Sequence, residues 1–256
     1  MIKKRMIFTL LYDDGDFVLS RNFNRQKIGD NKWLDINYNF SSIHRYIDEM
    51  IILNISNLRN DKNKKNFINC LRKISKNCFV PITSGGGISS IKDAKDLLDN
   101  GADKIAINTK LYKKDFIKKL ALKFGRQCIV GSIDFKKNEK KKYSIFLNNG
   151  KRKLDISIKK FSEDLDSRFI GEMLINSIDK DGTGTGLDFE VLHYFKKTRI
   201  PIIFQGGVGN SKHFIEGLKN KDIQAVSTAN ILNFIDDGLK YAREQIMKQK
   251  VNLPVR

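Results

Sequence analysis

Residues that could bind a ligand or exchange a proton follow several of the apolar runs in this sequence. The run Met173 to Ile175 leads into Ser177 to Gly186, which holds three glycines, two threonines and two aspartates. Glycines there let the backbone approach an anion closely, and amides turned toward it can hold a phosphate. The stretch therefore indicates a ligand-facing loop after a strand, with a flexible surface turn as the alternative.

Two carboxylates stand at the ends of predicted strands. Asp134 closes one apolar run, and Asp181 lies in the loop that follows another. Carboxylates at such positions could act as general acid, general base or orienting group. The alternative role for both is capping a turn or pairing with a nearby lysine.

Two further glycine-rich stretches, Gly85 to Gly87 and Gly206 to Gly207, each lie between a predicted strand and a helical pattern. Each is followed along the chain by a polar helix entry, so two anion sites could hold a ligand with two phosphates. Tight turns inherited by duplication are the alternative. The candidate phosphate-binding residues are Gly86, Gly87, Asn108, Thr109, Gly182, Thr183, Gly206, Gly207, Ala229 and Asn230.

Short apolar runs alternate with amphipathic helical patterns, which is typical of parallel βα units. Eight such pairs in 256 residues predict an α/β fold, a single (β/α)8 TIM barrel over residues 1–256. The predicted strands are Arg5 to Leu11, Glu49 to Ile55, Phe79 to Ser84, Lys104 to Asn108, Cys128 to Asp134, Glu172 to Ile178, Pro201 to Gln205 and Gln224 to Thr228. The predicted helices lie near 38–47, 63–76, 90–99, 112–124, 157–168, 188–197, 211–219 and 234–248.

Two connections depart from a plain barrel. The segment Asp13 to Trp33 is long, polar and basic, and connections of that size are usually functional or mobile. After strand five, Asn149 and Gly150 separate two alternating apolar runs, which predicts a small hairpin insertion.

Internal repetition divides the predicted barrel into two halves. Glu49 to Ser56 aligns with Glu172 to Asp179 at an offset of 123 (172 minus 49). Val80 to Gly87 aligns with Ile200 to Gly207 at an offset of 120 (200 minus 80). We therefore expect two related half-barrels, approximately 1–123 and 124–256. At the first offset Leu11 falls opposite Asp134.

Charged residues begin four of the predicted strands: Arg5, Glu49, Lys104 and Glu172. Charges at strand starts ordinarily stabilise the lower face of a barrel. Two acids and two bases at four strand starts could equally form a salt-bridged ring that closes the lower opening.

Composition narrows the possible partners. The net charge of +19 would suit nucleic acid or a membrane surface, but the lysines form scattered runs without interleaved aromatic residues. Three cysteines and three histidines show no metal-ligand spacing, so we expect no metal site and a reducing, cytoplasmic setting. The apolar stretch Met6 to Tyr12 is too short for a membrane span.

The motifs together resemble the cyclase subunit of imidazole glycerol phosphate synthase, a lyase of histidine biosynthesis. The resemblance covers nearly the whole chain and implies an enzyme without a cofactor. In that family the top of the barrel binds a bis-phosphorylated nucleotide derivative, and a HisH-type glutaminase subunit docks on the bottom. Ammonia passes through the barrel behind a charged gate that matches Arg5, Glu49, Lys104 and Glu172. The stretches that carry the resemblance are 85–88, 101–109, 124–130, 177–183 and 206–209.

The chain departs from the family at its catalytic pair. The family's two catalytic aspartates end strands one and five; the second matches Asp134, but the first falls on Leu11, which cannot exchange a proton. Leu19 stands where the family has a loop lysine, and Asn54 where it has an aspartate. Asp181, a supporting residue, is retained.

The first βα unit, at 7–14 and 19–23, resembles a branch associated with amidation of bacterial surface sugars. In that branch the barrel and its glutaminase supply ammonia to a separate amidotransferase, and this is our main hypothesis. The alternative is a working cyclase, which makes imidazole glycerol phosphate and AICAR, with Asp13 or Asp14 replacing the lost acid. A nucleic-acid-binding module is the third hypothesis, and only the net charge supports it.

Overall fold

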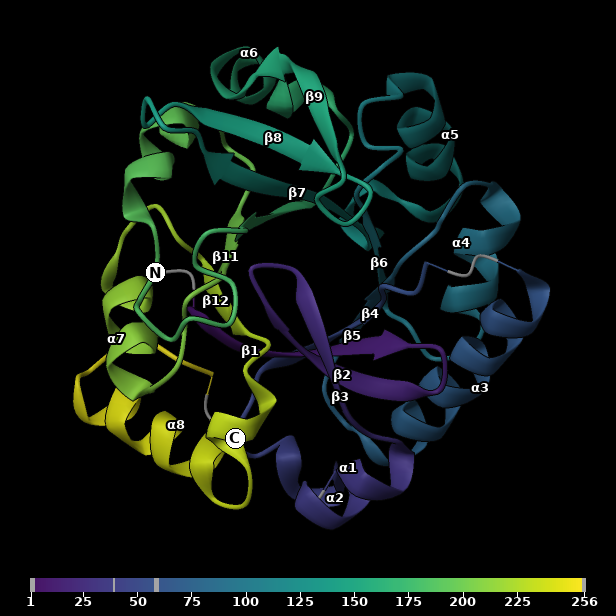
Figure 1. Ribbon diagram of the computed structural model, residues 1–256, viewed down its shortest axis with the longest axis vertical. Helices are drawn as coiled ribbons and strands as arrows, with labels where there is room; N and C mark the ends of the chain where they lie inside the picture. The colour runs from purple at the N-terminus through teal and green to yellow at the C-terminus, as the bar shows by residue number, and fades with distance from the viewer. Residues whose placement is uncertain (1–2, 39, 58–59, 255–256) are drawn as a thin grey trace.

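The computed structural model describes residues 3–38, 40–57 and 60–254. Eight parallel strands form a closed ring, because β10 pairs with both β7 and β11 and β12 pairs with β1. Helices surround the ring (Figure 1), which confirms the predicted (β/α)8 barrel. In chain order the strands are β1 (Arg5–Asp13), β4 (Glu49–Asn54), β5 (Ile82–Gly85), β6 (Lys104–Ile107), β7 (Ile129–Lys137), β10 (Glu172–Ser177), β11 (Ile202–Gln205) and β12 (Ala225–Thr228).

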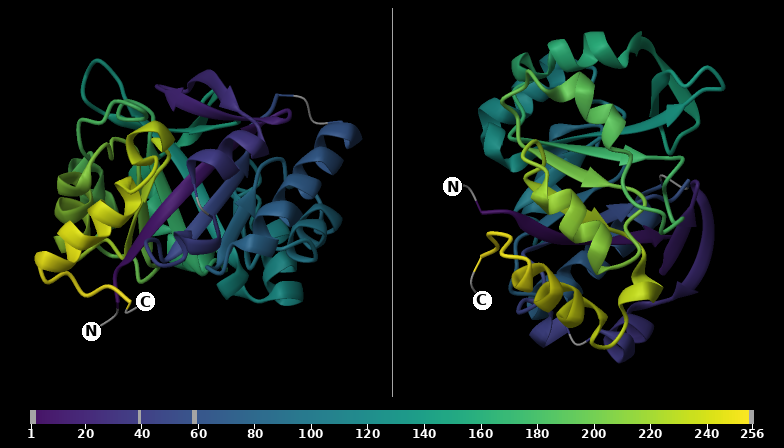
Figure 2. Two further views of the ribbon diagram at one scale, coloured as in Figure 1. Left: turned by 90° about the horizontal axis from the view of Figure 1, so that it is seen from below. Right: turned by 90° about the vertical axis from the view of Figure 1, so that its left-hand side faces the viewer.

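The first and fifth barrel strands, β1 and β7, are each followed by an antiparallel hairpin. β7 continues into β8 (Tyr143–Leu147) and β9 (Arg152–Ser157), as the Asn149 and Gly150 turn predicted. β1 continues into β2 (Asp16–Arg21) and β3 (Asn24–Gly29), so most of the long connection predicted over Asp13 to Trp33 is a second hairpin. The β2–β3 hairpin lies across the barrel mouth, at the opposite end from the start of β1 (Figure 2).

Eight α-helices and four 3-10 helices cover the described part of the ring. The α-helices are α1 (Asn31–Asn37), α2 (Phe40–Ile43), α3 (Asp61–Asn77), α4 (Ile91–Leu98), α5 (Lys114–Phe124), α6 (Ile158–Glu163), α7 (Ser211–Lys219) and α8 (Gly238–Lys248). The 3-10 helices are η1 (Arg126–Cys128), η2 (Leu165–Ser167), η3 (Phe189–Phe195) and η4 (Ile231–Phe234).

Two helix predictions were wrong. In place of one helix over 38–47 the chain forms α1 and α2, because the Asp30 side chain accepts hydrogen bonds from the amides of Lys32 and Trp33 and starts α1 early. The segment predicted as a helix over 188–197 is the 3-10 helix η3. The Asp188 carboxylate does not cap it, because this group accepts hydrogen bonds from Tyr143 and Lys137 instead.

Alternation along the strands separates two apolar layers. One set of side chains packs between the strands and the helices, as Phe8 and Met50 do. A smaller set fills the inside of the ring and forms a separate buried cluster of Ile7, Ile51, Val130, Leu174, Ile203 and Ala225. The barrel is therefore filled by side chains at mid-height, with polar groups left for its two ends.

Candidate functional site

A cavity of about 380 Å³ lies at the carboxyl ends of the barrel strands. The ends of β1, β4, β6, β7 and β10 and the loops after β5 and β6 line it, and both hairpins contribute residues. We call it the upper cavity. Its position is where barrels of this class carry their functional residues.

Leu11 and Asp134 both line the upper cavity. They belong to β1 and β7, which lie four strands apart in the ring of eight, as the internal repeat predicted. Leu11 is 6% exposed and Asp134 is 8% exposed, so both side chains are largely withdrawn from solvent. The position that holds an acid in the resembled family is therefore directed into the cavity, but it carries no titratable group.

Asp134 is held by two amides. Asn108 Nδ2 donates to its Oδ2 at 3.1 Å, and Asn176 Nδ2 donates to its Oδ1 at 3.2 Å. Burial raises the pKa of Asp134 to about 7, and the charge of Asp181 adds to the rise, although the two amides oppose it. A carboxyl group with such a pKa can donate or accept a proton near neutral pH.

Asp181 lines the same cavity and holds the β2–β3 hairpin. Its carboxylate accepts hydrogen bonds from Ser20 Oγ and from the Phe23 amide, the latter at 3.1 Å. Its carbonyl accepts from the Asn22 amide at 2.9 Å. Burial raises the pKa of Asp181, against these hydrogen bonds from Ser20 and Phe23, which lower it. Asp181 therefore joins the loop after β10 to the hairpin above the cavity.

The two hairpins meet over the upper cavity. A Cβ atom built on Gly150, in the β8–β9 turn, would lie 2.7 Å from Cδ2 of Phe23, in the β2–β3 turn. Asn149 Nδ2 in the same turn donates to the Ile55 carbonyl at 3.0 Å, which ties the β8–β9 hairpin to the end of β4. One hairpin from each half of the chain thus forms a roof over the cavity.

All four candidate phosphate-binding residues of the first half line the upper cavity: Gly86, Gly87, Asn108 and Thr109. Gly86 and Gly87 have φ values of +107° and +75°, a backbone conformation that favours glycine. Most of those in the second half line a smaller neighbouring cavity of about 10 Å³: Gly182, Gly206, Gly207, Ala229 and Asn230. Thr183 lies outside both cavities, and its hydroxyl donates to the Lys180 carbonyl at 2.9 Å.

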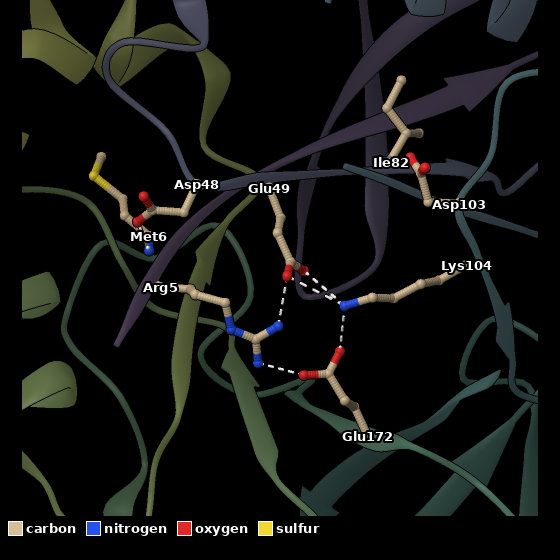
Figure 3. Close-up of polar contacts among 8 residues, drawn as sticks. All are labelled: Arg5, Met6, Asp48, Glu49, Ile82, Asp103, Lys104 and Glu172. Atoms are coloured by element: carbon tan, nitrogen blue, oxygen red, sulfur yellow. Dashed lines mark hydrogen bonds and ion pairs between the residues drawn. The ribbon is translucent and has the colours of Figure 1, made fainter. Parts of the chain in front are cut away.

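At the opposite end of the barrel, the four charged strand starts form a closed ring of ion pairs (Figure 3). Arg5 contacts Glu49 at 2.6 Å and also pairs with Glu172. Lys104 contacts Glu49 at 3.2 Å and Glu172 at 2.8 Å. Although burial opposes their charged forms, the partners raise the pKa of Arg5 and lower that of Glu172. The alternation of bases and acids leaves each charge with two opposite neighbours.

The side chains between this charged ring and the upper cavity change character with height. The apolar cluster that includes Ile7 and Val130 follows directly above the ring. Thr9 comes next along β1; it donates to Gln205 Oε1 at 3.1 Å and shares a 2.6 Å hydrogen bond with the hydroxyl of Ser227. Gln205 also lines the upper cavity. From the charged ring to the upper cavity, the interior of the barrel thus passes through an apolar layer and then a polar layer.

Sequence reasoning did not single out several residues of the site. Phe23, Arg25 and Asn148 line the upper cavity from the hairpins, and Lys64 lines it from α3. Two signals could have found the missed strands β2 and β3. Asp14 and Gly15, both with positive φ, form the turn that joins β1 to β2 and is of a type common between antiparallel strands, and a hairpin was already predicted after strand five.

Other kinds of site are absent from the described residues. In residues 3–38, 40–57 and 60–254 no group of three or more His, Cys, Asp or Glu side chains is arranged to hold a metal ion. Within the same ranges, every helix is too short or too polar to span a bilayer.

Comparison with known proteins agrees with this architecture. Residues 7–236 match the family described as "Histidine biosynthesis protein". A protein of Parasynechococcus marenigrum (strain WH8102), provisionally named imidazole glycerol phosphate synthase subunit hisF2, is 46% identical over 250 residues, which cover 97% of this chain and 92% of the relative. Imidazole glycerol phosphate synthase subunit HisF of Clostridium botulinum (strain 657 / Type Ba4) is 34% identical over 253 residues, which cover 97% and 98%. The chain therefore belongs to the HisF-type family of imidazole glycerol phosphate synthase cyclase subunits.

Proposed function

We propose that this chain is the barrel subunit of a glutamine-dependent amidotransferase that passes ammonia to an acceptor other than the cyclase substrate. The observation that carries the proposal is a complete charged ring at one end of the barrel and Leu11 in place of an acid at the other. The ring has the residues of an ammonia gate, whereas the cavity has lost half of an acid/base pair.

A glutaminase partner of the HisH type docks, in this proposal, on the face that carries the ring. Phe79 and Phe169 support this, because they precede β5 and β10 at that face and are 68% and 45% exposed. Exposed aromatic side chains are typical of protein interfaces. Ammonia released there would enter between Arg5 and Lys104 and pass the apolar cluster, where a small neutral molecule needs no charged ligand.

Loss of the cyclase reaction follows from the chemistry of position 11. A leucine side chain can neither take nor give a proton, so Asp134 lacks the opposite carboxylate with which it would share acid/base work. Asp13 and Asp14 do not take over the position. Asp13 pairs with Arg25 at 3.0 Å, Asp14 accepts from Asn63 at 3.1 Å, and neither lines the upper cavity.

The proposed acceptor is a nucleotide sugar or a surface polysaccharide precursor, amidated by a separate enzyme. Resemblance of the first βα unit to the branch of the family linked to surface-sugar amidation supports this assignment. The three free cysteines suit a reducing compartment, and we place the complex in the cytoplasm.

One observation favours a second candidate, the cyclase reaction of histidine biosynthesis. Asp134 and Asp181 both line the upper cavity, and the pKa of each is raised, so two carboxyl groups remain available there. In this alternative Asp181 supplies the acid that Leu11 lacks.

Complementation of a histidine auxotroph that lacks its own cyclase subunit separates the two functions. We expect no growth without histidine when this chain is expressed with its glutaminase. The Leu11→Asp variant is the matched test, since it restores the family's residue at the same place. Growth supported by the unaltered chain would overturn the proposal and favour the cyclase.

A further inference from the structure

One side of the barrel exposes apolar groups between two grooves of opposite charge. The helix α1 lies there, on the outside of the ring between α8 and α3 (Figure 1). Its residue Ile36 is 81% exposed, the largest exposed fraction among the large apolar side chains that the structure describes. Ile235 is also exposed, and the amide of the next residue, Asp236, donates to the Asn37 carbonyl of α1 at 3.3 Å. We call this region, with both grooves, the α1 surface.

The groove between α1 and α8 is acidic. Asp35, Asp236 and Asp237 line it, and its described lining residues include no lysine, arginine or histidine. Asp237 has one distant partner, Lys240, at 4.0 Å. Asp35 and Asp236 form no ion pair within residues 3–38, 40–57 and 60–254. This groove therefore carries negative charge that the rest of the described chain does not neutralise.

The groove between α1 and α3 has the opposite charge. Lys32, Lys73 and Lys76 line it, and Asp35 is the one acid among its described lining residues. All three lysines are exposed, and none of them forms an ion pair within the part of the chain that the structure describes. Asp35 and Asn77 line both grooves, so the two grooves adjoin each other around α1.

These features make the α1 surface complementary to itself. In a symmetric dimer each subunit presents the same surface, so a residue i that contacts a residue j of the other copy is matched by the reverse contact. A two-fold axis parallel to the barrel and close to Ile36 would place the acidic groove of each copy opposite the basic groove of the other. The two copies of Ile36 would meet near the axis, where burial of apolar surface favours association.

We propose that a second copy of this chain docks on the α1 surface and forms a two-fold dimer centred on Ile36. Asp236 of each copy lies opposite Lys76 of the other. The net charge of +19 opposes association, but charges more than about 8 Å apart are largely screened at physiological ionic strength. Opposite charges in contact across the interface lie closer than this, so their attraction remains. The dimer leaves both ends of each barrel uncovered and therefore goes beyond the proposed function without altering it.

Sedimentation of the intact chain over a range of concentrations tests this inference first. We expect a monomer–dimer equilibrium with a dissociation constant in the micromolar range. Ile36→Lys should weaken dimerisation at least about tenfold, because two like charges would then face each other near the axis. Leu122→Lys is the matched control, since Leu122 is 79% exposed on α5 and lies outside the α1 surface. It should leave the equilibrium unchanged.

Charge reversal tests whether unlike grooves face each other. Asp236→Lys and Lys76→Asp should each weaken dimerisation about tenfold, because like charges then meet on both sides of the axis. A mixture of these two variants should form mixed dimers, since both lysines of one variant then face both aspartates of the other. Asp155→Lys makes the same change in net charge as Asp236→Lys, but on β9, and should have no effect.

Three outcomes would overturn the inference. A chain that stays monomeric at about 100 μM and about 0.15 M salt has no such interface, even if its acidic groove binds some other partner. A dimer that Ile36→Lys does not weaken uses another surface. A dimer that the reversed charges weaken, but that does not form when the two variants are mixed, lacks the paired grooves. Sedimentation requires neither ammonia nor product, so each of these results is distinct from failure of the proposed function.

Discussion

Leu11 on β1 and Asp134 on β7 line one cavity from opposite sides of the closed barrel. One side chain cannot exchange a proton, and the other has its pKa raised by burial to about 7. The barrel also carries a charged ring at its opposite end, an apolar layer in its interior and a roof of two hairpins over the cavity. Each of these parts can be tested separately.

Asp134 should make the free energy of unfolding depend on pH. Burial raises its pKa to about 7 from an ordinary 3.8, so between these values the folded chain keeps a proton that the unfolded chain has lost. Stability from this group is complete below the lower value and falls as pH rises through the upper one, by about 4 kcal/mol in all.

Denaturant unfolding at about pH 5 and about pH 8 measures this effect. The Asp134→Asn variant should lose less stability between the two conditions than the unaltered chain. Asp155→Asn, an exposed change on β9, serves as the control and should follow the unaltered chain. Equal pH dependence in the unaltered chain and in Asp134→Asn would show that Asp134 titrates normally.

The charged ring should matter for ammonia from glutamine and not for free ammonia. Lys104→Ala leaves Glu49 and Glu172 with Arg5 as their only base in the ring, so the opening loses its closed set of contacts. In complex with the glutaminase, we expect the ratio of glutamine-driven to ammonium-driven product to fall about tenfold, equivalent to about 1.4 kcal/mol.

Lys95→Ala is the matched control, because it removes a lysine that pairs with Asp99 on the outer surface of α4. It should leave the ratio unchanged. If Lys104→Ala and Glu172→Ala both behaved like this control, the ring would have only a structural role.

A side chain at position 150 should disturb the contact between the two hairpins. Gly150→Ala places a methyl group 2.7 Å from the Phe23 ring, so one hairpin must move. We expect faster amide hydrogen exchange in β2 and β3 and a loss of about 1 kcal/mol or more in stability.

Gly15→Ala separates this contact from backbone strain. Gly15 has a φ of +106°, but a Cβ atom built on it meets nothing within 4 Å. The Gly15→Ala variant should therefore lose stability through backbone strain, but amide hydrogen exchange should not become faster throughout β2 and β3. Similar exchange in the two variants would argue that the hairpins form no common roof.

Much of the fold could be predicted because periodicity and turn chemistry are local properties. Apolar runs marked all eight barrel strands, and Asn149 with Gly150 marked the β8–β9 hairpin. The β2–β3 hairpin turns at Asn22 and Phe23, which both have positive φ but are not a common turn pair, and β3 is polar and basic. Weak alternation therefore concealed a hairpin that the internal repeat should have suggested.

The site could be predicted only where symmetry linked distant residues. Repeat offsets placed Leu11 opposite Asp134, and strand starts brought together the four charged residues of the ring. The contact between Phe23 and Gly150 joins residues that no local pattern relates, and so do the hydrogen bonds from Ser20 and Phe23 to Asp181. Such features follow from tertiary packing, which a single sequence does not reveal.

The most direct measurement is the rate at which the purified chain forms imidazole glycerol phosphate from the nucleotide precursor and ammonium chloride. The Leu11→Asp variant is assayed in parallel. The account predicts almost no product from the unaltered chain and a clear gain from the variant, since the added carboxyl group would stand across the cavity from Asp134. Turnover by the unaltered chain at a rate typical of HisF enzymes, with no gain from Leu11→Asp, would contradict it.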